Sequence, residues 1–460
     1  MFRRISIVFC VAISACSVEP VQPNLPDINN DWITSQGTQV DSQWWQHFAD
    51  DQLDQWVQQG LQNNQDLQAA WYRLLQSRAL WDASGADQFP SLDATVSRTS
   101  TESDDTSSQS WSARLSASYE IDFWGNIAAG KKQSEFNAMA QQAALRTLSN
   151  TVAGTIAESW YGWLVQEQTL ALLNEQKRRI ESSLAAVKGR YARGQVNVSD
   201  VWQQEQLLES INGSIEQTQA TRAIYRQTLA LWLSVPSQSL PESAAGQIPE
   251  LRNPIQHVHS DAIQQRPDVL QAYFDLQSAQ AGLAVAQSNR YPRFTLTASY
   301  TGESENINEV FDNWVTNFVA GLTAPLIDGG NRRALVRQNE AKVKEQIAHY
   351  KQVLLGAAQE VEQVLVNQTQ QYKYLASLSK QLTLAKQTQG FQERRYRKGV
   401  GDFIEMLNAQ TDVLDLEQSV LAAQWQLLQY RIELYRVISQ GIEVKDMAEK
   451  MAKADLESQG

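Results

Sequence analysis

The sequence predicts a mixed α and β membrane protein, with four β-strands per chain and two long α-helical hairpins. Three observations predict this class: a long run of alternating side chains, an internal duplication, and extended helix-period segments without proline. The chain has 460 residues and a formal net charge of -12. It lacks the basic stripe that binding to nucleic-acid phosphates requires, so we expect no nucleic acid as a partner.

The longest alternating run extends from Ser110 to Phe123. Its apolar side consists of Trp111, Ala113, Leu115, Ala117, Tyr119, Ile121 and Phe123, and its polar side of Ser110, Ser112, Arg114, Ser116, Ser118, Glu120 and Asp122. A half-buried strand of a soluble sandwich also alternates, but such strands are usually shorter. Aromatic residues near both ends favour the wall of a membrane barrel. We expect Trp111 near an external loop, and Phe123 and Trp124 near the periplasmic rim.

The whole pattern occurs twice, at an offset of about 202 to 205 residues. Residues 66–90 match residues 268–292, and an Arg-Tyr-x-x-Gly motif at 190–194 recurs at 395–399. A chance similarity of two helices would not preserve strands, turns and glycines together. The sequence therefore predicts an internal tandem repeat.

Each repeat is expected to contain a helix, a strand pair, a long helix and a return helix. Repeat 1 spans 51–240, with its strand pair at about 91–124, its long helix at about 126–192 and its return helix at about 198–233. Repeat 2 spans 241–440, with the same elements at about 293–326, 330–398 and 403–439. Polar loops at 100–109 and 302–312 are expected to connect the strands of each pair outside the membrane.

Four strands cannot close a membrane barrel, because the smallest known barrels have eight. Open strand edges are not tolerated in lipid, so other copies of the chain must close the barrel. Two copies would give a plugged barrel and three a wider, water-filled one. The polar inner face, with Arg114, Glu120 and Asp122, favours three copies. We predict a homotrimer with a twelve-stranded barrel.

The long helical segments are predicted to form coiled coils of periplasmic dimensions. At 1.5 Å per residue, each would reach about 100 Å. Apolar stripes at three- and four-residue steps support this. They comprise Leu145, Leu148, Val152, Ile156, Trp160 and Trp163 in the first long helix, and Ile347, Tyr350, Leu354, Ala357 and Val361 in the second. A further helical segment begins at Asp41.

The N-terminus predicts a lipoprotein. Residues 1–15 have the pattern of a signal peptide, too short to span a bilayer. Ile13-Ser14-Ala15-Cys16 resembles the bacterial lipobox, in which the cysteine becomes the first residue and is acylated; an ordinary signal peptide with an incidental cysteine is the alternative. The resemblance to lipoproteins implies sorting to the outer membrane rather than the inner, because Ser17 stands in place of an aspartate. Residues 16–50 would form a lipid-anchored extension and residues 441–460 a C-terminal tail.

No constellation of an enzyme is present in the sequence. Among the four histidines, only His257 and His259 lie close together, without cysteine or carboxylate partners at metal-site spacing. No nucleotide-binding loop or nucleophile elbow occurs. We expect no catalytic residues, no metal and no cofactor, so any energy must come from partner proteins.

Several motifs resemble the TolC family of outer-membrane efflux proteins. They are Arg266-Pro267-Asp268-Val269, the run from Ala279 to Ala286, Tyr291-Pro292 and the repeated Arg-Tyr-x-x-Gly motif. Trp44-Trp45 and the lipobox resemble its lipoprotein branch, the OprM/NodT-like partners of resistance-nodulation-division pumps. The resemblance implies a trimeric barrel on a long periplasmic α-helical tunnel. It also implies docking to a periplasmic adaptor and an inner-membrane RND pump, and passive export of drugs or other small toxic compounds.

The resemblance also implies functional residues at the periplasmic hairpin turns. Ile404, Glu405 and Asn408 would face the closed aperture, where Glu405 would form an acidic ring that favours cations. Members of the family often have an aspartate at the position of Asn408. Because asparagine carries no charge, this chain would not form a second acidic ring there. The matching position in the first copy is Asp200. Family members hold the closed end by bonds from such an aspartate, for which Arg395, Tyr396 and Arg397 are the candidate partners; an ion pair without function is the alternative.

Two other functions stay open at this point. The chain could be a TolC-like exit duct for type I protein secretion, although the lipobox and Trp44-Trp45 argue against it. It could also be a structural coiled-coil lipoprotein of the periplasm, which would leave the four alternating strands without an explanation.

Overall fold

A computed structural model describes residues 23–442, except 35, 36, 39, 104, 105 and 252. The described chain forms two compact units. Unit 1 comprises residues 78–137 and 275–348 together with 23–25, and unit 2 comprises residues 26–77, 138–274 and 349–442. Each unit takes segments from both sequence repeats, so the repeats do not correspond to separate compact bodies.

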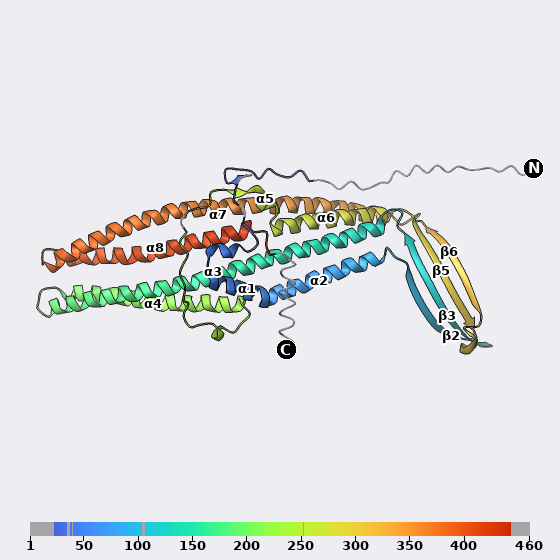
Figure 1. Cartoon of the computed structure of the whole chain (residues 1–460), viewed down its shortest axis with the longest axis horizontal. Helices are drawn as coiled ribbons and strands as arrows, with labels where there is room; N and C mark the ends of the chain where they lie inside the picture. The colour runs from blue at the N-terminus through green and yellow to red at the C-terminus, as the bar shows by residue number, and fades with distance from the viewer. Residues whose placement is uncertain (1–22, 35–36, 39, 104–105, 252, 443–460) are drawn as a thin grey trace, which may run out of the picture. The chain divides into compact units, whose positions relative to one another are not determined.

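A four-stranded antiparallel sheet dominates unit 1 (Figure 1). Its strands are β2 (Ser91–Ser103), β3 (Thr106–Ile121), β5 (Arg293–Ser304) and β6 (Trp314–Thr323), in the order β2-β3-β5-β6. Two strands come from each repeat, as predicted. Since β2 and β6 are the edges of this sheet, each presents unpaired backbone groups to which another strand can add.

The register of the sheet gathers the apolar side chains on one face. Ala117 lies opposite Leu92 on β2 and opposite Ala298 on β5, and Ala298 lies opposite Phe318 on β6. Leu92 and Phe318 are 66% and 84% exposed, so the rest of the described chain leaves these two side chains largely uncovered. An exposed apolar face opposite a polar one is what the wall of a water-filled membrane barrel requires.

The predicted polar loop at 100–109 is wrong. β2 and β3 stay paired as far as Ser103 and Thr106, which leaves only residues 104 and 105 between the strands. Thr favours the extended backbone, and the ladder of backbone hydrogen bonds does not depend on apolar side chains. In the second pair, β5 ends at Ser304 and the 3-10 helix η3 (Ile307–Glu309) precedes β6.

Asp122 was predicted to lie on the polar face of the strand that lines the barrel, and this prediction is wrong. β3 ends at Ile121, and the Asp122 carboxylate accepts hydrogen bonds from the N–H groups of Ile127 (3.1 Å) and Ala128 (2.8 Å). These groups lie in the first turn of α3 (Asn126–Tyr191), where they have no partner inside the helix. Asp122 therefore caps α3, and its negative charge suits the helix N-terminus.

Phe123 and Trp124 pack where β5 begins. The Trp124 ring stacks on Tyr291 with 4.6 Å between ring centroids, and its Nε1 donates to the Pro292 carbonyl oxygen at 2.8 Å. Phe123 lies 5.8 Å from the Phe294 ring. These aromatic contacts fix the junction of β3 and α3 to the start of the neighbouring strand.

Unit 2 is mainly helical, and four of its helices have their remaining residues in unit 1. The chain contains two long helical hairpins. Hairpin 1 consists of α3 and α4 (Val198–Trp232), and hairpin 2 consists of α7 (Asn331–Arg397) and α8 (Phe403–Ile438). Three further helices are α1 (Asp51–Asn63), α2 (Gln65–Ala86) and α6 (Pro267–Ser288). Shorter elements are η1 (Trp44–Phe48), η2 (Ser237–Ser239), α5 (Ser260–Gln264) and the paired strands β1 (Ile33–Thr34) and β4 (Val258–His259). The segment from Asp41 is thus not one helix, because it breaks at Ala49 and Asp50 between η1 and α1.

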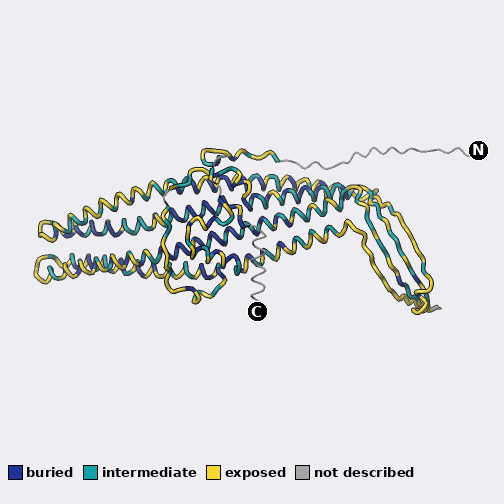
Figure 2. Tube along the Cα trace, viewed as in Figure 1, coloured by how far each residue is buried: buried dark blue, intermediate teal, exposed yellow. Residues whose placement is uncertain are grey.

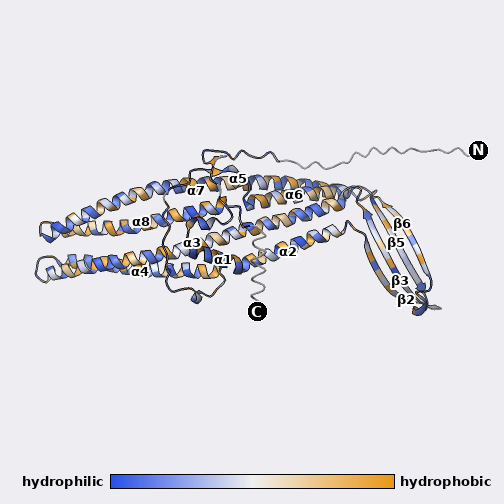
Figure 3. Cartoon of the chain, in the orientation of Figure 1, coloured by the Kyte–Doolittle hydropathy of each residue, from blue (hydrophilic) through white to orange (hydrophobic). Residues whose placement is uncertain are grey.

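Hydrophobic and hydrophilic residues are interleaved along the long helices (Figure 3). In the described part of the chain, no helix combines the length and the apolar character needed to cross a membrane. The apolar stripe of α3 is buried at Leu145, Val152, Ile156, Trp160 and Trp163. Figure 2 shows that burial is concentrated in the helices of unit 2, whereas exposed residues predominate along the strands of unit 1.

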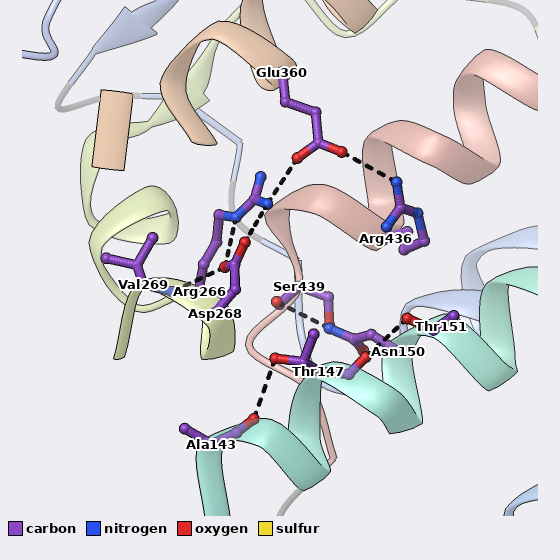
Figure 4. A network of polar contacts seen from close by, with 10 residues as sticks. All are labelled: Ala143, Thr147, Asn150, Thr151, Arg266, Asp268, Val269, Glu360, Arg436 and Ser439. Carbon is purple, nitrogen blue, oxygen red and sulfur yellow. Dashed lines mark hydrogen bonds and ion pairs between the residues drawn. The ribbon is translucent and has the colours of Figure 1, made fainter. Parts of the chain in front are cut away.

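A polar network joins α6, α7 and α8 within unit 2 (Figure 4). Arg266, with an 8% exposed side chain, donates from Nε to Asp268 Oδ1 at 3.1 Å and from Nη2 to Asp268 Oδ2 at 2.8 Å. Nη2 also donates to Glu360 at 2.7 Å, and Arg436 donates to the other oxygen of Glu360 at 3.1 Å. Burial alone would lower the pKa of Arg266, but the two carboxylates outweigh it and raise the pKa. The network stabilises the start of α6 against α7 and α8.

Candidate functional site

The candidate site lies where the two hairpins turn, in segments 192–197 and 398–402, which we call the tip. A glycine in the left-handed region ends the first helix of each hairpin, Gly194 with φ 68° and Gly399 with φ 75°. The N–H of Gly194 donates to Tyr191 O, and the N–H of Gly399 donates to Tyr396 O. Glycine adopts this backbone without strain, so the Arg-Tyr-x-x-Gly motif is a helix terminator followed by a tight return.

An apolar cluster holds the two hairpins together at the tip. Its buried members are Leu184, Val187, Val201, Tyr396, Phe403 and Met406. They come from all four long helices. Burial of this surface favours a closed contact between hairpin 1 and hairpin 2 within one chain.

Arg190 of α3 binds the C-terminal end of α7. The sequence did not predict this contact. Its guanidinium lies over the Tyr396 ring at 4.3 Å from the centroid and donates to the carbonyl oxygens of Tyr396 (3.1 Å) and Arg397 (3.3 Å). A cation is attracted by the face of an aromatic ring and also by the negative end of a helix, so both interactions stabilise this contact. The repeated Arg-Tyr pair in the sequence indicated that these residues matter, but it did not indicate which arginine contacts which tyrosine.

The three predicted aperture residues share the exposed side of α8. Ile404, Glu405 and Asn408 are exposed, whereas Phe403 and Met406 between them are buried. Arg395 Nη1 donates to Glu405 Oε2 at 3.1 Å, in an ion pair whose side chains are 39% and 48% exposed. The structure therefore brings one predicted aperture residue together with one predicted lock residue, inside the same hairpin.

Asp200 meets none of its three candidate partners within the chain. In the described residues its carboxylate has no hydrogen bond or ion pair to Arg395, Tyr396 or Arg397. Arg395 is engaged with Glu405, and Arg397 is 74% exposed and lies 4.0 Å from Glu393. The hydroxyl of Tyr396 is buried and has no hydrogen-bond partner among the described residues. The Asp200 lock stays a prediction, and its partner would have to come from another copy.

A second contact between the hairpins is centred on Glu417 of α8, above the tip. Two side chains of α3 donate to Glu417 Oε2, Arg179 at 2.5 Å and Gln176 at 3.1 Å. Lys386 of α7 forms an ion pair with Glu417 Oε1 at 3.0 Å. Burial by itself would raise the pKa of Glu417, but these three donors outweigh it and lower the pKa. A carboxylate with a 9% exposed side chain thus stays charged between two cations. The sequence analysis missed this cluster.

The histidines make local contacts. His259 Nδ1 accepts from the Asp261 N–H at the start of α5, and His257 Nδ1 lies 3.0 Å from the Asp31 carbonyl oxygen. Among the described residues, no group of three or more histidine, cysteine, aspartate or glutamate side chains is placed to hold a metal ion.

The two repeats are also recognised separately by one protein family. The sequence model described as "Outer membrane efflux protein" matches residues 56–234 and again residues 258–440. The chain belongs to this family. As an outer membrane efflux protein, it is the outer-membrane channel of an efflux system, and the alternative of a purely structural lipoprotein does not hold.

Relatives of this efflux protein match over most of its length. It is 28% identical over 420 residues to the pyoverdine export outer membrane protein OpmQ of Pseudomonas putida, covering 87% of this chain and 88% of OpmQ. It is 24% identical over 410 residues to the probable outer membrane lipoprotein SilC of Salmonella typhimurium, and the match covers 87% of this chain and 88% of SilC.

Among solved structures, the outer-membrane channel OprN superposes with a TM-score of 0.84 at 21% identity, covering 91% of this chain and 97% of OprN. This likeness confirms the predicted fold of the chain, in which a four-stranded sheet is joined to long α-helical hairpins.

Proposed function

We propose that the trimer docks with a periplasmic adaptor and an inner-membrane RND pump, and that the adaptor opens its tip. The efflux protein then conducts small compounds passively from the periplasm to the exterior. One observation carries the proposal: both hairpins end in matched glycine turns, beside which Ile404, Glu405 and Asn408 are exposed on α8. A helical tunnel with such an end is suited to being opened by a partner.

A small exported compound is supported over a secreted protein. OpmQ is named for pyoverdine export, which is export of a small molecule. A strain lacking the gene, tested against drugs, dyes, detergents and siderophores, should become sensitive to members of one chemical class, and the plasmid-borne gene should restore resistance. Loss of a secreted protein, with no change in any sensitivity, would instead favour the exit duct of type I secretion. Pull-down of the trimer from cross-linked cells identifies the adaptor.

Anchoring through Cys16 belongs to the same proposal, although Cys16 lies outside the described residues. Two acyl chains attach a protein stably to a membrane, whereas one is marginal. SilC is named an outer membrane lipoprotein, which supports an anchor here. Mass spectrometry of the mature N-terminal peptide should show Cys16 as the first residue with attached acyl groups, and Cys16→Ala should abolish that mass. An unmodified N-terminus at another residue would contradict the anchor.

Charge at the tip should set the ion preference of the channel. Glu405→Ala should weaken its preference for cations, because three carboxylates leave the ring. Arg395→Ala should strengthen that preference, because each Glu405 loses the cation at 3.1 Å that offsets its charge. Reversal potentials in planar bilayers under a salt gradient measure both effects.

Glu362→Ala is the matched control, because Glu362 is an exposed carboxylate of α7 that lies far from the tip. It should leave the reversal potential unchanged. An unchanged potential in Glu405→Ala as well would remove Glu405 from the selective ring.

A further inference from the structure

The apolar face of the sheet in unit 1 contains a groove. Its volume is about 360 Å³, and sites for small molecules measure roughly 300–1,000 Å³. Tyr119 and Leu296 line the groove, and they lie close to the end of β3 at Ile121 and to the start of β5 at Arg293. The groove is therefore near the end of the sheet at which β3 passes into α3.

The register of the strands explains why a groove forms there. Two neighbouring rows of the apolar face line it, and each row takes one residue from β3, β5 and β6 in turn. The rows are Ala117, Ala298, Phe318 and Tyr119, Leu296, Ala320. The residues between the two rows point their side chains to the other face, so they contribute only backbone on this side. The three small alanines form the floor of the groove, and the three large side chains form its walls.

The groove opens onto the surface that faces lipid. Leu296 and Phe318 are 44% and 84% exposed. The chain is an outer-membrane channel, and the apolar face of its sheet is the face that contacts the bilayer. An acyl chain that fills a groove gains dispersion contacts that a chain along a smooth wall does not make. The occupant that fits this surface is thus an acyl chain.

The position of the groove indicates which lipid supplies that chain. At this end of the sheet the Trp124 ring stacks on Tyr291 with 4.6 Å between ring centroids, and aromatic residues mark the boundary between a barrel wall and water. The long helix α3 departs from the same end, which is the periplasmic end of the wall in the proposed orientation. Phospholipids form the periplasmic leaflet of an outer membrane, so we expect a phospholipid chain at this depth.

A cation lies beside one end of the groove. Pro90 also lines the groove, and two residues before it Gln88 Oε1 accepts a hydrogen bond from Lys131 Nζ at 2.9 Å. Lys131 forms no ion pair with another described residue, so its charge is available to a ligand. Basic groups at the membrane boundary attract anionic headgroups. A phosphate at Lys131 would place its acyl chain at the Pro90 end of the groove.

We propose that each copy of the chain binds one phospholipid here, with an acyl chain over the three alanines and the phosphate at Lys131. This lipid is a retained ligand, distinct from the lipid around any membrane protein, because the groove and the ammonium group hold its chain and its headgroup together. The inference goes beyond the proposed function, since it concerns only the sheet and its junctions with α2 and α3 and requires no adaptor and no pump.

Native mass spectrometry of the full-length channel tests the proposal. The protein is delipidated in detergent and then incubated with one defined lipid. Dipalmitoyl-phosphatidylglycerol should give one bound lipid per copy of the chain. Dihexanoyl-phosphatidylglycerol has the same headgroup but short chains, and it should bind at least about tenfold more weakly, because it buries fewer CH₂ groups.

Ala298→Trp fills the floor of the groove. It should weaken the binding of dipalmitoyl-phosphatidylglycerol at least about tenfold, because the indole takes the place of the acyl chain. Ala94→Trp is the matched control, since Ala94 lies opposite Leu115 on the same apolar face but outside the groove. Ala320→Trp is a second filling variant. The same spectra show whether each variant keeps the oligomer mass of the wild type, which separates loss of lipid from failure to assemble.

Lys131→Ala should weaken the binding of dipalmitoyl-phosphatidylglycerol about fivefold, because one basic group near the headgroup is lost. Lys131→Arg should retain the binding, because it keeps the cation. Lys342→Ala removes an exposed lysine of α7 outside the groove and serves as the control. Equal binding by Lys131→Ala and the wild type would contradict the phosphate contact.

Two further results would overturn the proposal. In the first, the wild type retains no dipalmitoyl-phosphatidylglycerol, or both filling variants bind this lipid as well as Ala94→Trp does. In the second, Cys16→Ala binds the lipid and the wild type does not, because the groove is then occupied by the chain's own acyl anchor. Equal binding by Cys16→Ala and the wild type supports a separate phospholipid.

Discussion

Asp200→Ala should raise the open probability of the trimer in planar bilayers. The predicted lock is one exposed ion pair per interface, and such a pair contributes roughly 0.2–1 kcal/mol. Three interfaces break together, so we expect a total of about 0.6–3 kcal/mol, which corresponds to roughly a 3- to 150-fold shift toward the open state. The structure supports a partner in the next copy, because Asp200 bonds to none of its candidates within the described chain. Single-channel recordings measure the change.

Glu205→Ala is the matched control for this experiment. Glu205 is another carboxylate of α4, but it pairs with Lys188 of the same hairpin at 2.7 Å. Its removal should leave the open probability unchanged, because no interface between hairpins is altered. Equal recordings for Asp200→Ala and wild type would remove Asp200 from the lock, and Arg397→Ala should reproduce the Asp200→Ala effect if these two residues form the pair.

Arg266→Ala should lower the stability of unit 2 more than any other single change predicted here. It leaves the Asp268 and Glu360 carboxylates without their shared cation inside the network of Figure 4. Removal of one partner of a fully buried pair costs about 3–5 kcal/mol. The two carboxylates are 36% and 34% exposed, so water can partly replace the arginine, and we expect roughly 2–3 kcal/mol. Thermal unfolding of the detergent-solubilised trimer, followed by circular dichroism, measures the loss.

The effect of Arg266→Ala should depend on pH. Burial raises the pKa of Asp268, but the hydrogen bonds and charge of Arg266 outweigh it, so the pKa lies below its ordinary value. A lowered pKa stabilises the fold above the unfolded-state pKa, about 3.9 for Asp, and this contribution is lost as pH falls through the folded-state value. The difference in Tm between wild type and variant should therefore be full at neutral pH and shrink below about pH 4. Arg178→Ala, on the exposed side of α3, should change Tm little at any pH, and a difference that grows on acidification would contradict this account.

Much of the fold could be predicted from the sequence, because it depends on patterns that repeat locally. The strict alternation from Ser110 required an extended strand, since only a period of two separates those side chains into an apolar and a polar face. The duplication then doubled the strand pairs, and the intolerance of lipid for open edges required more than one copy. The end of each long helix was visible in the Arg-Tyr-x-x-Gly motif, because glycine is the residue that most readily takes the left-handed backbone.

Pairings between distant residues were decided only by the tertiary structure. Periodicity placed Arg190, Arg395 and Asp200 near the tip, but the rotation of each helix in the bundle determines which arginine meets which acceptor. Arg190 thus reaches Tyr396, Arg395 turns to Glu405, and Asp200 is left for a partner outside the chain. Glu417 shows the same limit, since Arg179 lies 238 residues away in sequence and 2.5 Å away in space. Local patterns determine which elements form, whereas contacts of this kind depend on how those elements pack.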